Sequence, residues 1–342
     1  MELMKIDGSF GEGGGQIIRT AVTLSTITKK PIEIVNIRKN RKIPGLRPQH
    51  LTGIKILGKI CNAKIKGLQV GSTSIEFVPG EVESKKIHED VGTAGSISLI
   101  SQVLIPVVSF CEKRLELSIT GGTDVSWSPT GDYTKHVLKE AYSRMGIDFS
   151  MEIKKRGYYP SGSGQVNLEI NPSKKINPIN LDKRETKECS LYCSFSKIDS
   201  KVIESNLQKI MTQLEEKDFK IKKFVSNEDS INEGAVVLLS SIDSKSIIGV
   251  DSLLDRKNQG FSSKLPDRFA SLNLSVDDNL SDMLVVPASL SKDMSSYKVR
   301  NITSHLETNL YVTSKITGCK NGIGKIDDGY EVRIIGSSYP SV

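Results

Sequence analysis

Gly8-Ser-Phe-Gly-Glu-Gly-Gly-Gly-Gln-Ile-Ile-Arg19 leads a glycine-rich turn straight into an apolar run with helical spacing at residues 16–27. A similar start recurs at Gly92-Thr-Ala-Gly95, before residues 96–107, and at Thr303-Ser304, before residues 305–316. Another helix is expected at residues 45–61, and short β-rich runs at 31–37, 74–79, 115–119 and 165–170. The pattern predicts an α/β (α+β) fold built from a repeated unit of about 80 to 100 residues.

The 342 residues suit two domains, or one large core with an insertion. A composition change begins near Asn171, and the segment after it has its own strand and helix pattern at residues 191–195, 202–216, 220–225, 235–240 and 247–251. We therefore predict a core formed by residues 1–182 and 264–342, with a small inserted α/β domain at 183–263.

Composition excludes several classes of protein. Apolar residues make up 37% of the chain, enough for a sizeable core. The most apolar stretch, at residues 97–110, is interrupted by Pro106 and by polar residues, so it falls short of the ~18 apolar residues of a membrane span. No apolar leader is recognisable at the start, and five cysteines are scattered along the chain. These features favour a cytoplasmic location with no membrane partner.

The positive charge is concentrated in one segment. The whole chain carries 47 − 40 = +7, whereas residues 29–66 hold eleven Lys or Arg and one Glu, which is 11 − 1 = +10. This segment indicates either a phosphate-rich partner or a solvated lysine face. Arg38, Arg41 and Arg47 lie in a connection that contains Pro and Gly, and Arg is well suited to binding phosphate in a bidentate manner.

The glycine-rich turn has the features of an anion site. Its glycines allow close approach of the backbone, and the following helix would present free N–H groups. The turn is not a Walker A loop, since no Gly-Lys-Ser/Thr follows, and it lacks a complete dinucleotide fingerprint. Glu12 within such a loop would repel phosphate unless a divalent cation joined them. A purely structural turn remains the alternative.

Histidine is scarce, with four in the chain. His305 opens a predicted helix, where it is either a cap or a nucleophile beside a bound anion. His50 lies in the basic segment and could contact phosphate, whereas His88 and His136 are expected to be structural or exposed. The loop at 120–132, which bears the single Trp, and the glycine-rich turn at 156–166 could both be turns only.

Taken together and in this order, these segments resemble the RNA 3'-terminal phosphate cyclase family. The matching motifs are Gly11-Glu-Gly-Gly-Gly-Gln-Ile-Ile-Arg19, Pro44-Gly-Leu-Arg-Pro-Gln-His50, Gly95-Ser-Ile-Ser-Leu-Ile-Ser-Gln102, Gly121-Gly-Thr-Asp124, Arg156-Gly-Tyr-Tyr-Pro160 and Thr303-Ser-His-Leu-Glu-Thr-Asn309. The resemblance covers about residues 1–170 and 265–317. It implies repeated βαβαββ units, each a four-stranded sheet with two helices, and a small α/β insertion.

The same resemblance implies ATP-dependent conversion of an RNA 3'-terminal phosphate to a 2',3'-cyclic phosphodiester. His305 would form a covalent adduct with AMP, which then passes to the RNA phosphate. Glu12 would hold Mg²⁺ or Mn²⁺. The residues implied to bind the RNA phosphate are Arg19, Arg38, Arg41 and Gln49, and those implied to bind the nucleotide are Gln102, Pro129, Asp132, Asn279, Leu280, Ser281, Asp282 and Met283.

The sequence departs from the family at Asn279, where relatives carry an aromatic residue or His that stacks on adenine. Two other functions stay open. The first is a non-catalytic relative that binds RNA in rRNA processing or ribosome assembly, a branch of the family that lacks the histidine. The second is a carboxyvinyl transferase of similar fold, which the basic segment fits less well. A homo-oligomer is an alternative to a monomer.

Overall fold

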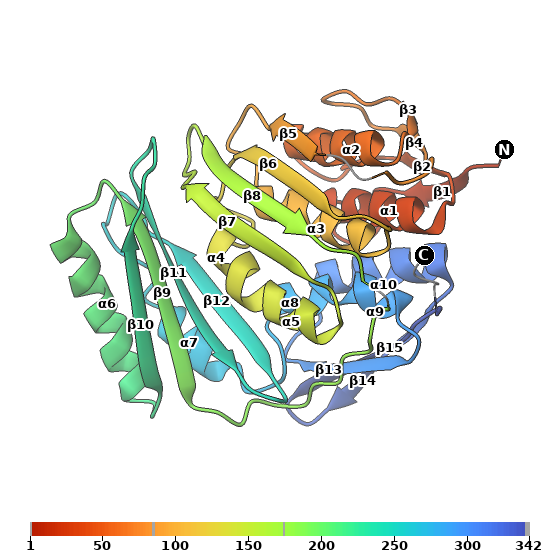
Figure 1. Cartoon of the computed structure of the whole chain (residues 1–342). Coiled ribbons are helices and arrows are strands. Elements are labelled where there is room, and N and C mark those ends of the chain that lie inside the picture. Colours follow the sequence, from red (N-terminus) through yellow and green to blue (C-terminus); the bar gives the residue numbers. More distant parts are fainter. Residues whose placement is uncertain (1, 84–85, 174, 339–342) are drawn as a thin grey trace.

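The computed structural model describes residues 2–83, 86–173 and 175–338 and confirms the mixed α/β class (Figure 1). The first unit forms a four-stranded sheet of order β1-β2-β4-β3, with β1 parallel to β2 and the other pairs antiparallel. Two helices connect its strands. The elements are β1 (Met4–Asp7), α1 (Gly15–Thr28), β2 (Ile32–Val35), α2 (Pro48–Ile60), β3 (Lys64–Lys66) and β4 (Ile75–Val78).

The second unit repeats this topology. Its sheet has the order β5-β6-β8-β7 with the same pattern of parallel and antiparallel pairs. The second connecting helix contains a π-helical turn in its middle. The elements are β5 (Lys86–Asp90), α3 (Ile97–Ser109), β6 (Leu115–Gly121), α4 (Gly131–Tyr133), η1 (Thr134–Leu138), α5 (Lys139–Arg144), β7 (Phe149–Lys155) and β8 (Gly164–Ile170).

The third unit corrects one prediction, because its sheet β13-β15-β14 has three named strands rather than four. Two short segments occupy the position of the missing first strand. The Leu181 N–H donates to the Ser296 carbonyl at 2.9 Å, and the Ser275 N–H donates to the Lys298 carbonyl at 3.2 Å. The elements are α8 (Asp278–Met283), α9 (Val285–Leu290), β13 (Met294–Val299), α10 (Ser304–Thr317), β14 (Lys320–Ile326) and β15 (Gly329–Ile335).

Between these two segments the chain forms a separate sheet of order β10-β9-β11-β12, on the left of Figure 1. This sheet has its own hydrophobic cluster, to which Leu265, Phe269 and Leu272 belong. The cluster therefore extends past residue 263, and the predicted division of the chain into domains stays a prediction. The elements are β9 (Glu188–Ser196), α6 (Ser200–Glu215), β10 (Lys220–Asn227), β11 (Gly234–Ile242), β12 (Ile247–Leu253) and α7 (Leu265–Ser271).

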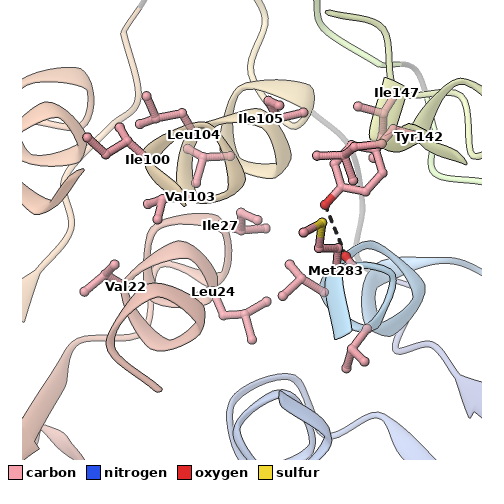
Figure 2. Packing of buried hydrophobic residues seen from close by; sticks show 14 of the residues in the cluster. Val22, Leu24, Ile27, Ile100, Val103, Leu104, Ile105, Tyr142, Ile147 and Met283 are labelled. Atoms are coloured by element: carbon pink, nitrogen blue, oxygen red, sulfur yellow. Dashed lines mark hydrogen bonds between the residues drawn. The ribbon is translucent and has the colours of Figure 1, made fainter. Parts of the chain in front are cut away.

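A second, larger core holds the helices of the three units together (Figure 2). Val22 and Leu24 of α1 are buried with Val103 and Leu104 of α3. In the same core the Tyr142 hydroxyl of α5 donates to the carbonyl oxygen of Met283 at 3.1 Å. Because this packing joins all three units, it fixes the relative positions of the helix ends that carry the predicted site residues.

Element ends differ from the predictions where the backbone becomes left-handed. The helix expected from residue 45 begins at Pro48, because Gly45 has φ +78° and Arg47 is the extended N-cap. The strand expected at 31–37 ends at Val35, and Asn36 has φ +54°. Among the described residues, no helix combines the length and the apolar character that a membrane crossing requires.

Candidate active site

Residues from all three units line one cavity of about 510 Å³. Most of the predicted site residues meet there, although they come from distant parts of the chain. These are Glu12, Arg19, Arg38, Arg41, Gln49, Gln102, Pro129, Asn279, Asp282, Met283 and His305. The remaining lining residues are Gly15, Gln16, His50, Leu99, Trp127, Ser128 and Arg268. Asp132, Leu280 and Ser281 do not line it.

The glycine-rich turn places the N-terminal end of α1 at this cavity. Gly14 is the N-cap and makes no side-chain capping bond, and the first turn contains no acidic residue. A Cβ on Gly15 would lie 2.3 Å from Nε2 of His50 and 3.0 Å from Nη1 of Arg19. Glycine is therefore required at this position for His50 and Arg19 to reach the helix end. The free N–H groups make the helix end suitable for an anion.

His305 faces the cavity from the first turn of α10. Thr303 caps this helix, since its hydroxyl accepts a hydrogen bond from the Leu306 N–H at 3.0 Å. Nε2 of His305 lies 3.4 Å from Oε2 of Glu12, and Nδ1 is buried and has no hydrogen-bond partner in the part of the chain that the structure describes. Burial lowers the pKa of His305; Glu12 opposes this, and Arg19 adds to it. The imidazole is therefore neutral at neutral pH and keeps a lone pair.

Two guanidinium groups carry donors that have no partner among the described residues. Arg19 and Arg38 each have a buried Nε that makes no hydrogen bond. Burial is also the main reason that the pKa of Arg19 is lowered. Arg41, by contrast, is ion-paired with Glu12. Buried donors are almost always satisfied in folded proteins, so these two Nε atoms are the structural feature that most directly indicates an anionic ligand.

Gln49 and His50 add two oriented donors. The Gln49 Oε1 accepts from the Ser96 N–H at 3.2 Å, which leaves the amide nitrogen for a ligand. The His50 Nδ1 accepts from the Arg47 N–H at 3.1 Å. Burial, with Arg19 and neighbouring arginines, lowers the pKa of His50 to about 3. His50 is therefore a neutral ring whose proton is on Nε2, on the side of Gly15.

Asp282 lines the cavity from α8. Burial raises the pKa of its carboxyl group to about 8, although Arg19 acts in the opposite direction. The carbonyl oxygen of Asp282 accepts a hydrogen bond from the Asn309 amide at 2.8 Å, and Asn309 in turn accepts from the Gln16 amide at 3.0 Å. Asn309 thus joins α8, α10 and α1 directly behind the cavity. Leu280 and Ser281 belong to the same helix but are fully buried and do not line the cavity.

Asp132 lies away from the cavity, in a buried ion-pair network. Nη2 of Arg156 lies 2.8 Å from Asp132, Nη1 lies 3.1 Å from Asp124 and Nε lies 2.7 Å from Glu228. Arg156 and the two aspartates are almost fully buried. Burial favours a lower pKa for Arg156, but Asp124 and Asp132 outweigh it, so the guanidinium stays charged. The network connects the second unit to the inserted sheet.

The basic segment at 29–66 separates into two groups. Arg38 and Arg41 line the cavity, whereas Lys55 and Lys59 both pair with the buried Glu89. Lys66 pairs with Glu76 on the same sheet. Two of the three arginines of the 38–47 connection thus line the cavity, and four of the eight lysines form ion pairs elsewhere. The phosphate-rich partner stays a prediction.

Trp127 and Arg268 line the cavity without having been predicted as site residues. Trp127 was within a loop that could have been a turn only. Arg268 comes from α7, which packs with the inserted sheet, and no local pattern signals that its side chain lines this cavity. Gly15 and Gln16 belong to the motif around Glu12, so their presence in the cavity follows from the position of α1.

The side chains of the cavity could bind a divalent cation only together with a phosphate ligand. Within the described ranges there is no cluster of three or more His, Cys, Asp or Glu side chains that could hold a metal ion by itself. Glu12 is largely buried and already faces Arg41 and His305. Mg²⁺ is commonly held by one or two carboxylates together with substrate phosphates, and Glu12 beside several arginines fits that arrangement.

Fold and cavity together define an α+β protein whose repeated units surround a cationic cavity with a neutral histidine, as suits chemistry on phosphate groups. The chain belongs to the RNA 3'-terminal phosphate cyclase family, whose sequence model matches residues 10–323.

Several curated relatives carry the name RNA 3'-terminal phosphate cyclase. The protein from Thermococcus kodakarensis is 41% identical over 93% of this chain and 94% of its own length. The protein from Methanosarcina barkeri is 36% identical over 97% of this chain and the full length of the relative. The protein from Pyrococcus furiosus is 36% identical over 96% of this chain and 98% of its own length. The family is thus an enzyme family, and the match spans all three units and the insertion.

Proposed function

We propose that the protein converts an RNA 3'-terminal phosphate to a 2',3'-cyclic phosphodiester with ATP, through an adduct of His305 with AMP. The observation that carries the proposal is the meeting of His305, Glu12 and four predicted phosphate-binding residues in one cavity. The names of the relatives support the overall reaction. A non-catalytic RNA-binding role would not require a neutral histidine beside unpaired arginine donors.

In the first step, Nε2 of His305 attacks the α-phosphorus of ATP. The N–P bond forms, the bond from the α-phosphorus to the bridging oxygen breaks, and pyrophosphate leaves. Attack through Nε2 fits the structure because Nδ1 is buried. The lowered pKa of His305 supplies the neutral nucleophile without a separate base. Arg19 and Arg38 provide donors for the phosphate oxygens.

In the second step, an oxygen of the RNA 3'-phosphate attacks the AMP phosphorus, which breaks the N–P bond and restores His305. The neighbouring 2'-hydroxyl then attacks the RNA phosphorus, its proton is lost, and AMP leaves. Adenylation is required because a phosphate oxygen is otherwise a poor leaving group. Gln49 and His50 would hold the RNA phosphate; in support, both line the cavity, and each has its acceptor atom engaged by a backbone N–H, which leaves an N–H donor for a ligand.

Mg²⁺ or Mn²⁺, held by Glu12 together with phosphate oxygens, would neutralise the triphosphate and the departing pyrophosphate. Oε2 of Glu12 lies 3.4 Å from Nε2 of His305, so both side chains would reach the phosphates of bound ATP. We further propose a cytoplasmic location, which is supported by the free thiol state of each of the five cysteines.

The deciding experiment is incubation with ATP labelled at the α-phosphorus and a divalent cation, followed by denaturing electrophoresis and mass analysis. We expect a base-stable, acid-labile AMP adduct in the wild-type protein and none in His305→Ala. His88→Ala is the matched control, because His88 is exposed and lies outside the cavity. An adduct of undiminished yield in His305→Ala would refute the proposed nucleophile.

A further inference from the structure

A second cavity of about 610 Å³ adjoins the first and has no role in the chemistry described above. The two cavities share Arg38, Gln49, Leu99, Trp127 and Ser128. We call the second one the flanking cavity. Its other walls are the N-terminal end of α2, the turn at 93–96 before α3, and the loops that carry Val125 and Tyr159. A ligand bound by Arg38 and Gln49 can therefore extend from one cavity into the other.

Trp127 lines both cavities, and both the exposure of its ring and its backbone conformation are unfavourable. Its side chain is 99% exposed, although it is the largest apolar ring in the chain. Its backbone is left-handed, with φ +68°, which bulky side chains rarely adopt. The neighbouring Ser128 hydroxyl donates to the Val125 carbonyl at 3.1 Å and holds the loop. Such features are most often retained at sites where a ligand covers the ring.

Tyr159 presents a second exposed ring on an anchored backbone. Its side chain is 66% exposed. The preceding Tyr158 is buried, and its hydroxyl donates to the Ser194 carbonyl at 3.3 Å. The carbonyl of Tyr159 accepts a hydrogen bond from Arg256 at 2.6 Å. The backbone is therefore fixed from both sides while the ring itself remains available.

Charge restricts the occupant of the flanking cavity. Its lining includes Arg38 and Arg47 and, among the described residues, no Asp or Glu. Two exposed aromatic rings combined with guanidinium groups suit a chain that alternates bases and phosphates. An acidic peptide would satisfy the arginines but would leave both rings uncovered.

We propose that the flanking cavity holds the nucleotides that precede the RNA 3' end, with bases stacked on Trp127 and Tyr159 and backbone phosphates near Arg47. This inference rests on the proposed function, because the cavity with His305 fixes where the RNA 3' end lies. It adds a strand-binding subsite that recognises single-stranded character rather than sequence, because every base has a stacking face.

The single Trp of the chain makes a direct test available. The wild-type protein, without ATP, is titrated with a 3'-phosphorylated RNA hexamer and with the same hexamer made abasic at the positions before the 3' end. We expect quenching of Trp127 fluorescence by the normal hexamer and little quenching by the abasic one. Cyclisation should show a KM at least about tenfold higher for the abasic hexamer, because the loss of even one of the two base stacks implies a change of that size.

Tyr159→Ala should reduce this difference in KM between the two hexamers and leave the rate of AMP adduct formation unchanged. Phe224→Ala is the matched control, since Phe224 is also a half-exposed aromatic residue but lies on β10, outside both cavities. It should behave as the wild type. Equal KM values for both hexamers, with no change in fluorescence while cyclisation proceeds, would overturn the subsite and leave the proposed function intact.

If neither an AMP adduct nor a cyclic product forms, the proposed function fails, but the fluorescence titration still decides the subsite. Quenching by the normal hexamer alone would support an RNA-binding cavity that does not depend on catalysis. Equal quenching by both hexamers would overturn the stacking.

Discussion

Oε2 of Glu12 lies 3.4 Å from Nε2 of His305 and is also ion-paired with Arg41, so a single carboxylate oxygen connects the proposed nucleophile of the third unit with the basic loop of the first. Glu12 raises the pKa of His305, while Arg41 lowers it. The balance of these two neighbours with burial determines whether the imidazole is charged.

We expect the pKa of His305 to lie below its ordinary value of 6.5, so that AMP adduct formation is constant near neutral pH and falls in acid. Replacing Glu12 by Gln should lower the pKa further, and replacing Arg41 by Gln should raise it. Titration of the four histidine rings by NMR, with His305→Ala for assignment, measures the pKa without relying on activity. Shifts in the same direction for both variants would contradict this electrostatic account.

Gly15→Ala should abolish adduct formation, because the added Cβ would lie 2.3 Å from Nε2 of His50. His50 and Arg19 would have to move, and the end of α1 would lose its place at the cavity. Gly322→Ala is the control, since a Cβ there meets no atom within 4 Å. Adduct yields of the two variants should differ by more than tenfold, as expected when a binding group is displaced. Equal yields would show that the close approach at Gly15 is dispensable.

Arg156→Ala should destabilise the fold by about 3–5 kcal/mol, because Asp124 and Asp132 would stay buried without a cation. Urea unfolding measures this change. Arg333→Ala removes an exposed ion pair with Glu331 and should cost less than about 1 kcal/mol. Asp132→Asn should likewise lower stability. A raised KM for ATP in Asp132→Asn, with unchanged stability, would instead support the predicted nucleotide role of Asp132.

Asp282→Asn should change how stability depends on pH. Burial raises the pKa of Asp282 from 3.8 to about 8, so between these values the folded state holds a proton that the unfolded state releases. The free energy of unfolding from this group therefore falls as pH rises from about 4 to about 8. Urea unfolding across that range should show a smaller fall in Asp282→Asn than in the wild type. Asp327→Asn, in an exposed turn, should leave the fall unchanged.

The repeated units and two helix ends at the cavity could be predicted from the sequence because their signals are local. The nucleotide-binding residues, by contrast, were expected only from the family resemblance. The glycine turn before α1 and the Thr-Ser-His start of α10 mark helix ends by residue type alone, and both ends line the cavity. The order of these motifs then indicated the family, which the comparisons confirmed.

The remaining residues depend on contacts between distant segments. Asp132 pairs with Arg156 and accepts a hydrogen bond from Ser194, which lies on β9 of the inserted sheet. Nothing near Asp132 in the sequence signals either contact. Arg268 reaches the cavity only because α7 packs on the inserted sheet. The third sheet lacks a named first strand because the insertion divides that strand, and a strand interrupted in this way has no periodic pattern to detect.

Because Asn309 joins α1 to α10, the cavity can be completed only late in the synthesis of the chain. Glu12 leaves the ribosome early, whereas His305 and Asn309 follow only after the inserted sheet and β13. A nascent chain that has completed only its first two units contains Arg19 and Arg38 but lacks the proposed nucleophile. If the proposed function holds, nucleotide transfer becomes available only once translation has passed α10, and incomplete chains would compete for RNA ends without modifying them.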